Sequence, residues 1–296
     1  YKLDKLQTFM KIFIRKEMKN LDTLVGDIYK SIEPLTNNKS LKISEDTINS
    51  FGESMKDVLR HWSKAQDVKK ESIRMSGIGK PLRRMWYDAK YPSKNKNEDS
   101  FLPIKFLYGH ILEEVLLLLV ELAGHKATDK QKQVNLNGVK GHIDCKIDNE
   151  IIDIKTASNF AFNKFKKGTL ADDDPFGYLA QLSGYEEAEG TSNGGFLVIN
   201  KESGELVLHR PEELDKPNSF NLITKIRKSL EEESPPEKCY DPIPEGKSGN
   251  LKLDKNCGYC PHKFRCYPSI RVFNYSKGYV YFTKIVSEPK VQEVWL

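Results

Sequence analysis

The apolar positions of the chain predict helices in its first part. From Leu3 to Trp62 they recur three or four residues apart, a spacing typical of amphipathic helices. After the glycine- and proline-containing breaker Ser76 to Pro81, the same spacing resumes over Leu82 to Tyr91, which predicts a domain boundary near residue 75. The apolar stretch Phe106 to Ala123 ends before a glycine and predicts a buried helix.

The middle of the chain predicts a sheet. Its strand candidates are Gln133 to Leu136, Val139 to Ile147, Ile151 to Thr156, Gly195 to Asn200 and Glu205 to His209. The first three are separated by Asn137-Gly138 and Asp148-Asn149, pairs that favour two-residue hairpin turns. A helix is expected over Tyr178 to Ala188, and the charged stretch Asn163 to Asp174 is expected to be a loop. Strands with helices before and after them predict the α/β class.

Composition narrows the class of protein. Lysine and arginine (47) slightly exceed aspartate and glutamate (42), so the net charge of +5 over 296 residues neither requires nor excludes nucleic acid. The longest apolar run, Val115 to Val120, is far shorter than the roughly 20 residues that cross a bilayer. The charged start, Tyr1 to Lys19, lacks the pattern of a signal peptide. A cytoplasmic protein without membrane contact is therefore expected.

Two of the strand candidates place acidic residues opposite each other. With a two-residue turn at Asp148-Asn149, counting outward pairs Asp144 with Asp153, about 5 Å apart and close enough to share Mg²⁺ or Mn²⁺. Lys155 shares that face and would steer a water or stabilise phosphoryl charge. The same residues also fit a surface salt bridge, and the spacing alone leaves both readings open. The opposite, apolar face is expected to hold Ile143, Cys145 and Ile147.

Three motifs in order resemble the PD-(D/E)XK nuclease superfamily, in particular its RecB-like branch, which includes CRISPR-associated and phage exonucleases. They are Gly141-His142-Ile143-Asp144, Ile152-Asp153-Ile154-Lys155 and Gln181-Leu182-Ser183-Gly184-Tyr185, which match the Gly-x-x-Asp, acidic-x-Lys and Gln-x-x-x-Tyr patterns. The resemblance implies a restriction-endonuclease-like α/β fold, with a central mixed sheet flanked by helices, over residues 76–230. Residues 1–75 are expected to form a helical N-terminal region, and residues 231–296 a C-terminal region with a cysteine cluster.

The resemblance also implies roles for single residues. The implied ligands of a catalytic Mg²⁺ or Mn²⁺ are His110, Asp144, Asp153 and the backbone carbonyl of Ile154. Lys155 would hold or help to deprotonate the attacking water, while Gln181 and Tyr185 would orient Lys155 or contact the DNA backbone. Without that context, a histidine near the start of an apolar helix is more often a packed or capping residue.

Glu113 and Glu114 follow His110 by three and four residues, so they lie on roughly the same helical face. They would reach a second metal ion or orient His110. A solvated edge of the helix is the alternative for each of them.

Four of the five cysteines gather near the end of the sequence. Cys257, Cys260 and Cys266 form a C-x2-C-x5-C run, which resembles the C-terminal run of iron–sulfur members of the same branch. Those relatives supply a fourth cysteine before the nuclease core, where Gly79 to Arg84 contains none, so Cys239 is the expected substitute. Four thiolates suit a 4Fe-4S cluster, which we prefer, or structural zinc. Unliganded cysteines are a third alternative, but a metal-stapled tail that otherwise lacks apolar content is expected.

Two groups of basic and aromatic residues are candidate DNA contacts, because such mixtures hold phosphates and stack unpaired bases. The first is Lys164, Lys166 and Lys167, interleaved with Phe162 and Phe165, and the second is Arg83, Arg84, Trp86 and Tyr87. For the first group a solvated loop is the alternative.

Taken with the resemblance, these residues predict a metal-dependent DNA exonuclease that hydrolyses phosphodiester bonds. Its expected substrates are single-stranded DNA ends, in recombination, repair or replication, in a bacterial or phage-infected cell. A structure-specific endonuclease and a non-catalytic DNA-binding module on the same fold are the alternatives. Nothing in the sequence resembles a base-reading element such as a helix-turn-helix, which disfavours sequence-specific cleavage.

Overall fold

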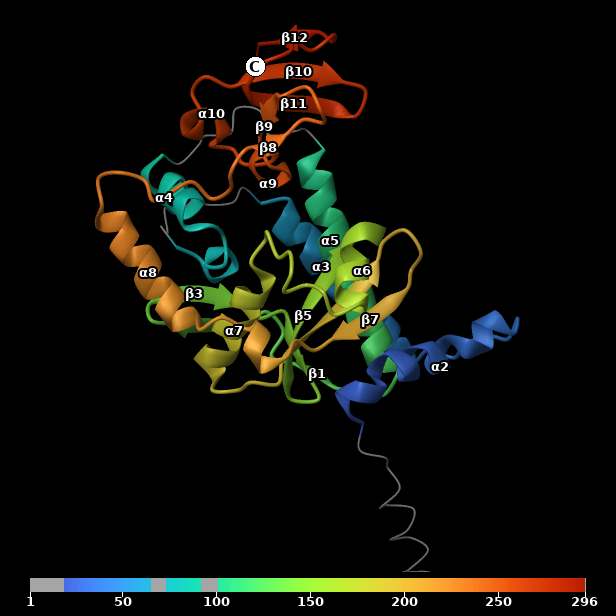
Figure 1. Ribbon diagram of the computed structural model, residues 1–296. Coiled ribbons are helices and arrows are strands. Elements are labelled where there is room, and N and C mark those ends of the chain that lie inside the picture. Colours follow the sequence, from blue (N-terminus) through green and yellow to red (C-terminus); the bar gives the residue numbers. More distant parts are fainter. Residues whose placement is uncertain (1–18, 65–72, 92–100, 296) are drawn as a thin grey trace, which may run out of the picture.

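A mixed five-stranded sheet forms the centre of the molecule. The computed structural model describes residues 19–64, 73–91 and 101–295 (Figure 1). The strand order is β1-β4-β5-β6-β7; β5 and β6 run parallel, and the other neighbours run antiparallel. The strands are β1 (Ala127–Thr128), β4 (Cys145–Ile147), β5 (Glu150–Ala157), β6 (Gly195–Asn200) and β7 (Leu206–His209).

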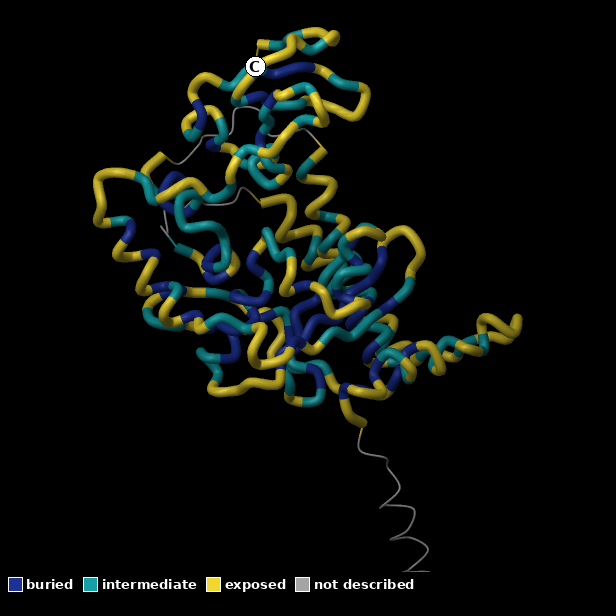
Figure 2. Tube along the Cα trace, viewed as in Figure 1, coloured by how far each residue is buried: buried dark blue, intermediate teal, exposed yellow. Residues whose placement is uncertain are grey.

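Helices cover both faces of this sheet, and an apolar core lies under each layer. One layer consists of α6 (Asn159–Lys166), α7 (Tyr178–Glu189) and α8 (Ser219–Glu231), and the other of α2 (Leu24–Thr36) and α5 (Leu102–Leu122). Buried positions accordingly gather in the middle of the chain trace (Figure 2). The predicted class, a central mixed sheet flanked by helices, is confirmed.

The N-terminal region is helical over the described residues, as predicted. It contains η1 (Leu21–Thr23), α2 and α3 (Glu45–Trp62), and α3 packs against α5. The Ser44 hydroxyl accepts a hydrogen bond from the Thr47 N–H at the start of α3, where Glu45 and Asp46 also suit the helix dipole. The apolar residues of the first 18 positions lie outside the described part.

The two predicted hairpin turns are confirmed, but one predicted strand is divided. Asn137, Gly138, Asp148 and Asn149 all have positive φ, as two-residue turns of this kind require. Where Val139 to Ile147 was expected as one strand, β3 (Val139–His142) pairs with β2 (Gln133–Leu136), and β4 pairs with β5. The expectation that Ile143 shares a face with Cys145 and Ile147 is wrong, because the chain changes partners there and Ile143 joins the opposite core.

The predicted loop at Asn163 to Asp174 is also wrong in its first part. Residues Asn159–Lys166 form α6, which begins where the Ser158 hydroxyl accepts a hydrogen bond from the Ala161 N–H. Phe162 and Phe165 lie one turn apart and are buried in the core.

The C-terminal region forms a second five-stranded sheet in the order β12-β10-β11-β9-β8. Phe273 and Phe282 are each 1% exposed and pack edge to face, so this region has an apolar centre that its sequence pattern did not predict. Its elements are β8 (Ile243–Pro244), β9 (Leu251–Lys252), α9 (Lys255–Gly258), α10 (Lys263–Cys266), β10 (Arg271–Tyr275), β11 (Gly278–Lys284) and β12 (Glu293–Val294).

This region lies at one end of the molecule, beside α4 (Leu82–Lys90), which separates it from α8 (Figure 1). Two short 3-10 turns complete the fold, η2 (Met75–Gly77) and η3 (Glu213–Asp215). Of the helices in the described ranges, none combines the length and the apolar character that a membrane span needs.

Candidate active site

The β4–β5 hairpin brings the two predicted carboxylates together. Cys145 pairs with Ile152, so the next positions outward are Asp144 and Asp153, as the turn arithmetic predicted. Asp144 lies just before β4 begins, and its Oδ2 accepts a hydrogen bond of 2.7 Å from the Ile154 N–H. Because the N–H and C=O of one strand residue point to the same side of the strand, the Ile154 carbonyl points to the side on which Asp144 lies.

Asp153 is the most unusual residue of the site. It is only 1% exposed, and within the described residues its Oδ1 has no hydrogen-bond donor. Its Oδ2 forms a close ion pair with the Lys155 ammonium. A buried carboxylate normally has several donors, so its unused oxygen sites suit a divalent cation.

Further charges around Asp153 make the site crowded with carboxylates. Burial raises the pKa of Asp144 well above its ordinary value, and the nearby charge of Asp153 adds to this. Burial also raises the pKa of Glu113 to about 7. Burial by itself would lower the pKa of Lys155, but the charges of Asp153 and Asp144 outweigh it, so this pKa lies above its ordinary value. One charged lysine thus faces several acids, an arrangement that favours binding of a cation.

The helix α7 supplies the predicted Gln-x-x-x-Tyr pair. Gln181 Nε2 donates a hydrogen bond of 2.8 Å to the Tyr185 hydroxyl, one helical turn away. Burial raises the pKa of Tyr185, and the negative charge of Asp153 raises it further. A Cβ atom at Gly141 would lie 2.7 Å from Tyr185 Cε1 and 2.6 Å from Met75 Cβ, so the glycine of the Gly-x-x-Asp pattern lets α7 approach the strand.

His110, the predicted histidine ligand, lies two turns inside α5. Its side chain is 46% exposed, and Nδ1 lies 4.0 Å from Glu113 Oε2. In the described ranges, no three His, Cys, Asp or Glu side chains form a ready-made metal site. The roles of His110, Glu113 and Glu114 in metal binding therefore stay predictions.

Sequence reasoning missed two further residues of this site. Gln131 Nε2 donates a hydrogen bond of 2.9 Å to Glu113 Oε1 and so links α5 to the loop before β2. The ring of Tyr178 lies 4.8 Å from Lys155 Nζ and helps to hold the lysine in place through a cation–π contact. Tyr178 is three residues before Gln181, the spacing of one helical turn, and that was the only sequence signal for it.

The four cysteines of the predicted cluster line one cavity of about 30 Å³. Cys239 joins Cys257, Cys260 and Cys266, although 17 residues separate it from the next. Burial and the neighbouring cysteines raise the pKa of Cys257 to about 12. Arg83 Nε donates a hydrogen bond of 3.1 Å to Cys266 Sγ, and Arg84 lines the same cavity. Burial likewise raises the pKa of Cys239 and Cys260, although the charge of Arg83 acts against this at Cys239 and that of Arg84 at Cys260.

The prediction that the aromatic residues of α4 stack on DNA bases is wrong, because both side chains are buried. Trp86 is 3% and Tyr87 8% exposed. The Trp86 indole donates to the Glu232 carbonyl, and Tyr87 stacks on His262 with ring centroids 5.3 Å apart. Arg83 and Arg84 face the cysteine cavity, so this helix joins the C-terminal region to the core.

The expected DNA contacts around Lys164, Lys166 and Lys167 are corrected in part. Phe162 and Phe165 are core residues and leave no ring open for a base. Lys164 pairs with Asp173, and Lys166 pairs with Glu205, both on the protein itself. Lys167 is exposed at the end of α6.

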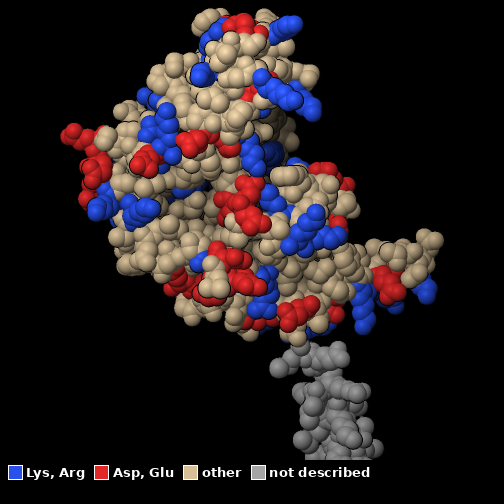
Figure 3. Space-filling model, in the orientation of Figure 1, with Lys and Arg blue, Asp and Glu red and all other residues tan. Residues whose placement is uncertain are grey.

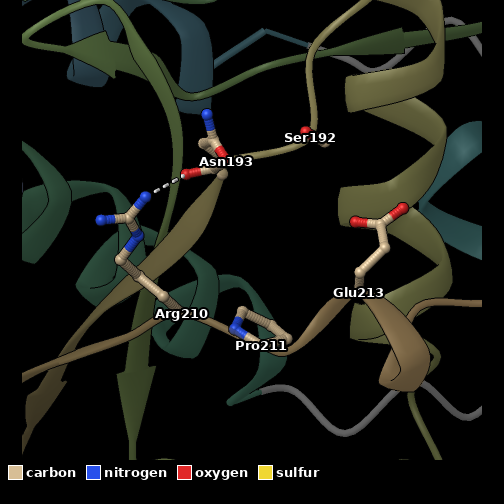
Figure 4. A pocket seen from close by; sticks show the side chains of 6 residues that line it. Ser192, Asn193, Arg210, Pro211 and Glu213 are labelled. Carbon is tan, nitrogen blue, oxygen red and sulfur yellow. Dashed lines mark hydrogen bonds between the residues drawn. The ribbon is translucent and has the colours of Figure 1, made fainter.

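A separate cavity of about 460 Å³ opens beside the start of β6 and the end of β7 (Figure 4). It is lined by Ser192, Asn193, Gly194, Arg210, Pro211 and Glu213. Arg210 donates to the Asn193 carbonyl and pairs with Asp22. None of the predicted site residues lines it. Acidic side chains also gather near the middle of the face in Figure 3, with lysines and arginines around them.

Comparisons with known proteins give distant structural likenesses. No protein-family model matches the chain, and no curated protein matches it. A crystal structure named SSO0001 is 18% identical, with 74% of this chain and 95% of that chain covered and a TM-score of 0.38. An alkaline exonuclease from Laribacter hongkongensis is 11% identical, with 51% and 79% covered and a TM-score of 0.35. A phage-related exonuclease from Haemophilus somnus is 13% identical, with 54% and 90% covered and a TM-score of 0.35. Likenesses of this size assign neither a family nor an activity to the chain.

Proposed function

We propose that this protein is a metal-dependent DNA exonuclease that hydrolyses phosphodiester bonds at single-stranded ends, in recombination, repair or replication. The observation that carries the proposal is Asp153, a buried carboxylate next to Asp144 that pairs with Lys155 through Oδ2, while no described residue donates a hydrogen bond to its Oδ1. The order of the three motifs, which resembles the RecB-like branch of PD-(D/E)XK nucleases, supports DNA as the substrate.

Asp144, Asp153 and the Ile154 carbonyl would hold Mg²⁺ or Mn²⁺, with His110 as a further candidate ligand. The bound ion would polarise the scissile phosphate and make a bound water more acidic. Lys155, whose ammonium pairs with Asp153, would hold the attacking water or help to deprotonate it, and would stabilise charge on the phosphoryl oxygens. Asp153 and the Tyr178 ring hold its ammonium in place.

The test is digestion of end-labelled single- and double-stranded DNA with Mg²⁺ or Mn²⁺. Wild type should release label stepwise, and both EDTA and Asp153→Asn should abolish release. Asp57→Asn, an exposed change on α3, is the matched control and should leave the rate unchanged. Cutting of a covalently closed circle would instead indicate the endonuclease. DNA binding without cutting by folded wild type would leave the non-catalytic module as the function.

We also propose that Cys239, Cys257, Cys260 and Cys266 hold a 4Fe-4S cluster, with structural zinc as the alternative. Their common cavity and the Arg83 hydrogen bond to Cys266 support thiolate ligation. Anaerobic purification should give a brown protein with iron and sulfide in equal amounts. A colourless protein with one zinc per chain would favour zinc. A protein that contains neither iron nor zinc would refute metal ligation by these cysteines.

A further inference from the structure

An exposed aromatic ring stands beside the candidate catalytic lysine. Phe176 is 62% exposed, and its ring stacks on that of Tyr178 with centroids 5.4 Å apart and planes 22° from parallel. Tyr178 in turn lies over Lys155 Nζ. A line of contacts therefore runs from solvent through two rings to the ammonium group of the site.

The backbone that carries Phe176 is fixed on both sides. Asp174 accepts hydrogen bonds from the N–H groups of Gly177 (3.0 Å) and Leu179 (2.9 Å) at the start of α7. Gly177 has a φ of +76° and packs so closely on Gly79 that a Cβ atom there would lie 2.5 Å from Gly79 Cα. The ring is therefore held in place before any ligand binds, which lowers the entropic cost of stacking on it.

Two of the three acidic residues just before the ring, Asp173 and Asp174, are already engaged, whereas Asp172 is exposed. Asp173 pairs with Lys164 at 2.7 Å and with Lys255 of the C-terminal region at 2.9 Å. Asp174 is engaged by the two backbone N–H groups of α7. Their charge is thus partly compensated, which reduces the repulsion that a phosphate backbone would meet near Phe176.

We propose that Phe176 is a stacking site for one unpaired nucleobase of the substrate strand, beside the nucleotide whose phosphate is cleaved. The proposal rests on the proposed function and explains how the site would select single-stranded over double-stranded DNA. Tyr178 covers one face of the Phe176 ring, and the other face is available to a base. Because every base has a π-face, such a site tolerates any sequence. A base inside a duplex is stacked and paired already, so the site favours single strands.

The test is binding of the full-length protein to short single-stranded oligonucleotides in EDTA, where no cleavage occurs. One set carries a single abasic position, moved nucleotide by nucleotide from each end. Wild type should lose affinity by about five- to 150-fold when the stacked base is missing, the range of one base–aromatic stack. Phe176→Ala should bind the intact strand that much more weakly and be insensitive to the same abasic position. Phe176→Trp should keep both the affinity for the intact strand and the sensitivity to the abasic position, whereas Phe176→Leu should keep neither.

The matched control is Phe220→Ala. Phe220 is also an exposed phenylalanine (48%), but it lies beside Glu187, at the opposite end of α7 from Phe176. If Phe176→Ala binds and digests single strands like wild type, the stacking site is refuted while the nuclease stands. If wild type neither binds nor cleaves DNA in any form, the proposed function fails and the stacking site fails with it.

Discussion

Replacement of Glu113 by glutamine should stabilise the metal-free protein at alkaline pH. Burial raises the pKa of Glu113 from an ordinary 4.5 to about 7. A group whose pKa is raised on folding is most favourable below its unfolded pKa, and that contribution is lost as the pH rises through the folded pKa. The difference corresponds to about 3 kcal/mol of unfolding free energy, lost between about pH 4.5 and pH 7. Glutamine remains neutral and can still bond to Gln131.

The assay is urea unfolding of wild type and Glu113→Gln in EDTA at pH 5 and pH 8. At pH 5 the two should differ little, and at pH 8 the variant should be more stable by up to about 3 kcal/mol. Glu121→Gln, on the exposed side of the same helix, should match wild type at both pH values. A stability difference between Glu113→Gln and wild type that is the same at both pH values would refute the reasoning.

Three further changes test the structure elsewhere. Gly141→Ala should cost about 1–3 kcal/mol of stability and slow DNA cleavage, because the added methyl group displaces Tyr185; thermal unfolding and the digestion assay check this. Lys216→Met should cost about 3–5 kcal/mol in urea unfolding at neutral pH, since it leaves the buried Glu186 carboxylate, now 2.9 Å away, without its cation. Cys257→Ser should abolish the metal binding proposed for the four cysteines and make the C-terminal region more sensitive to limited proteolysis than the core, as mass spectrometry of the fragments would show.

The parts of the fold that local patterns determine could be predicted from the sequence. The turn at Asp148-Asn149 sets the register of β4 on β5, so Asp144 and Asp153 directly follow the last strand pair, Cys145 with Ile152. The helix α7 was predicted within one residue, and the spacing of Gln181 and Tyr185 placed both on one face.

The parts that long-range packing determines could not be predicted. The chain changes its strand partner at Ile143, because β3 pairs with β2 whereas β4 pairs with β5. Trp86 and Tyr87 resemble a DNA-binding pair in the sequence, but residues from Glu232 to His262 bury them. Three of the five strands in the C-terminal sheet, β8, β9 and β12, have only two residues, too few for a periodic signal.

Asp144 differs from Asp153 in a way that affects how mutants of the site are interpreted. Its carboxylate takes the place of a main-chain carbonyl, because it accepts a hydrogen bond from the Ile154 N–H just before β4 begins. A substitution there removes a candidate ligand and a backbone hydrogen bond of the central sheet at once. Lost activity in an Asp144 variant would therefore not distinguish the loss of a candidate metal ligand from a disturbance of the sheet. Asp153 carries no such bond, so its variants report on the chemistry more directly.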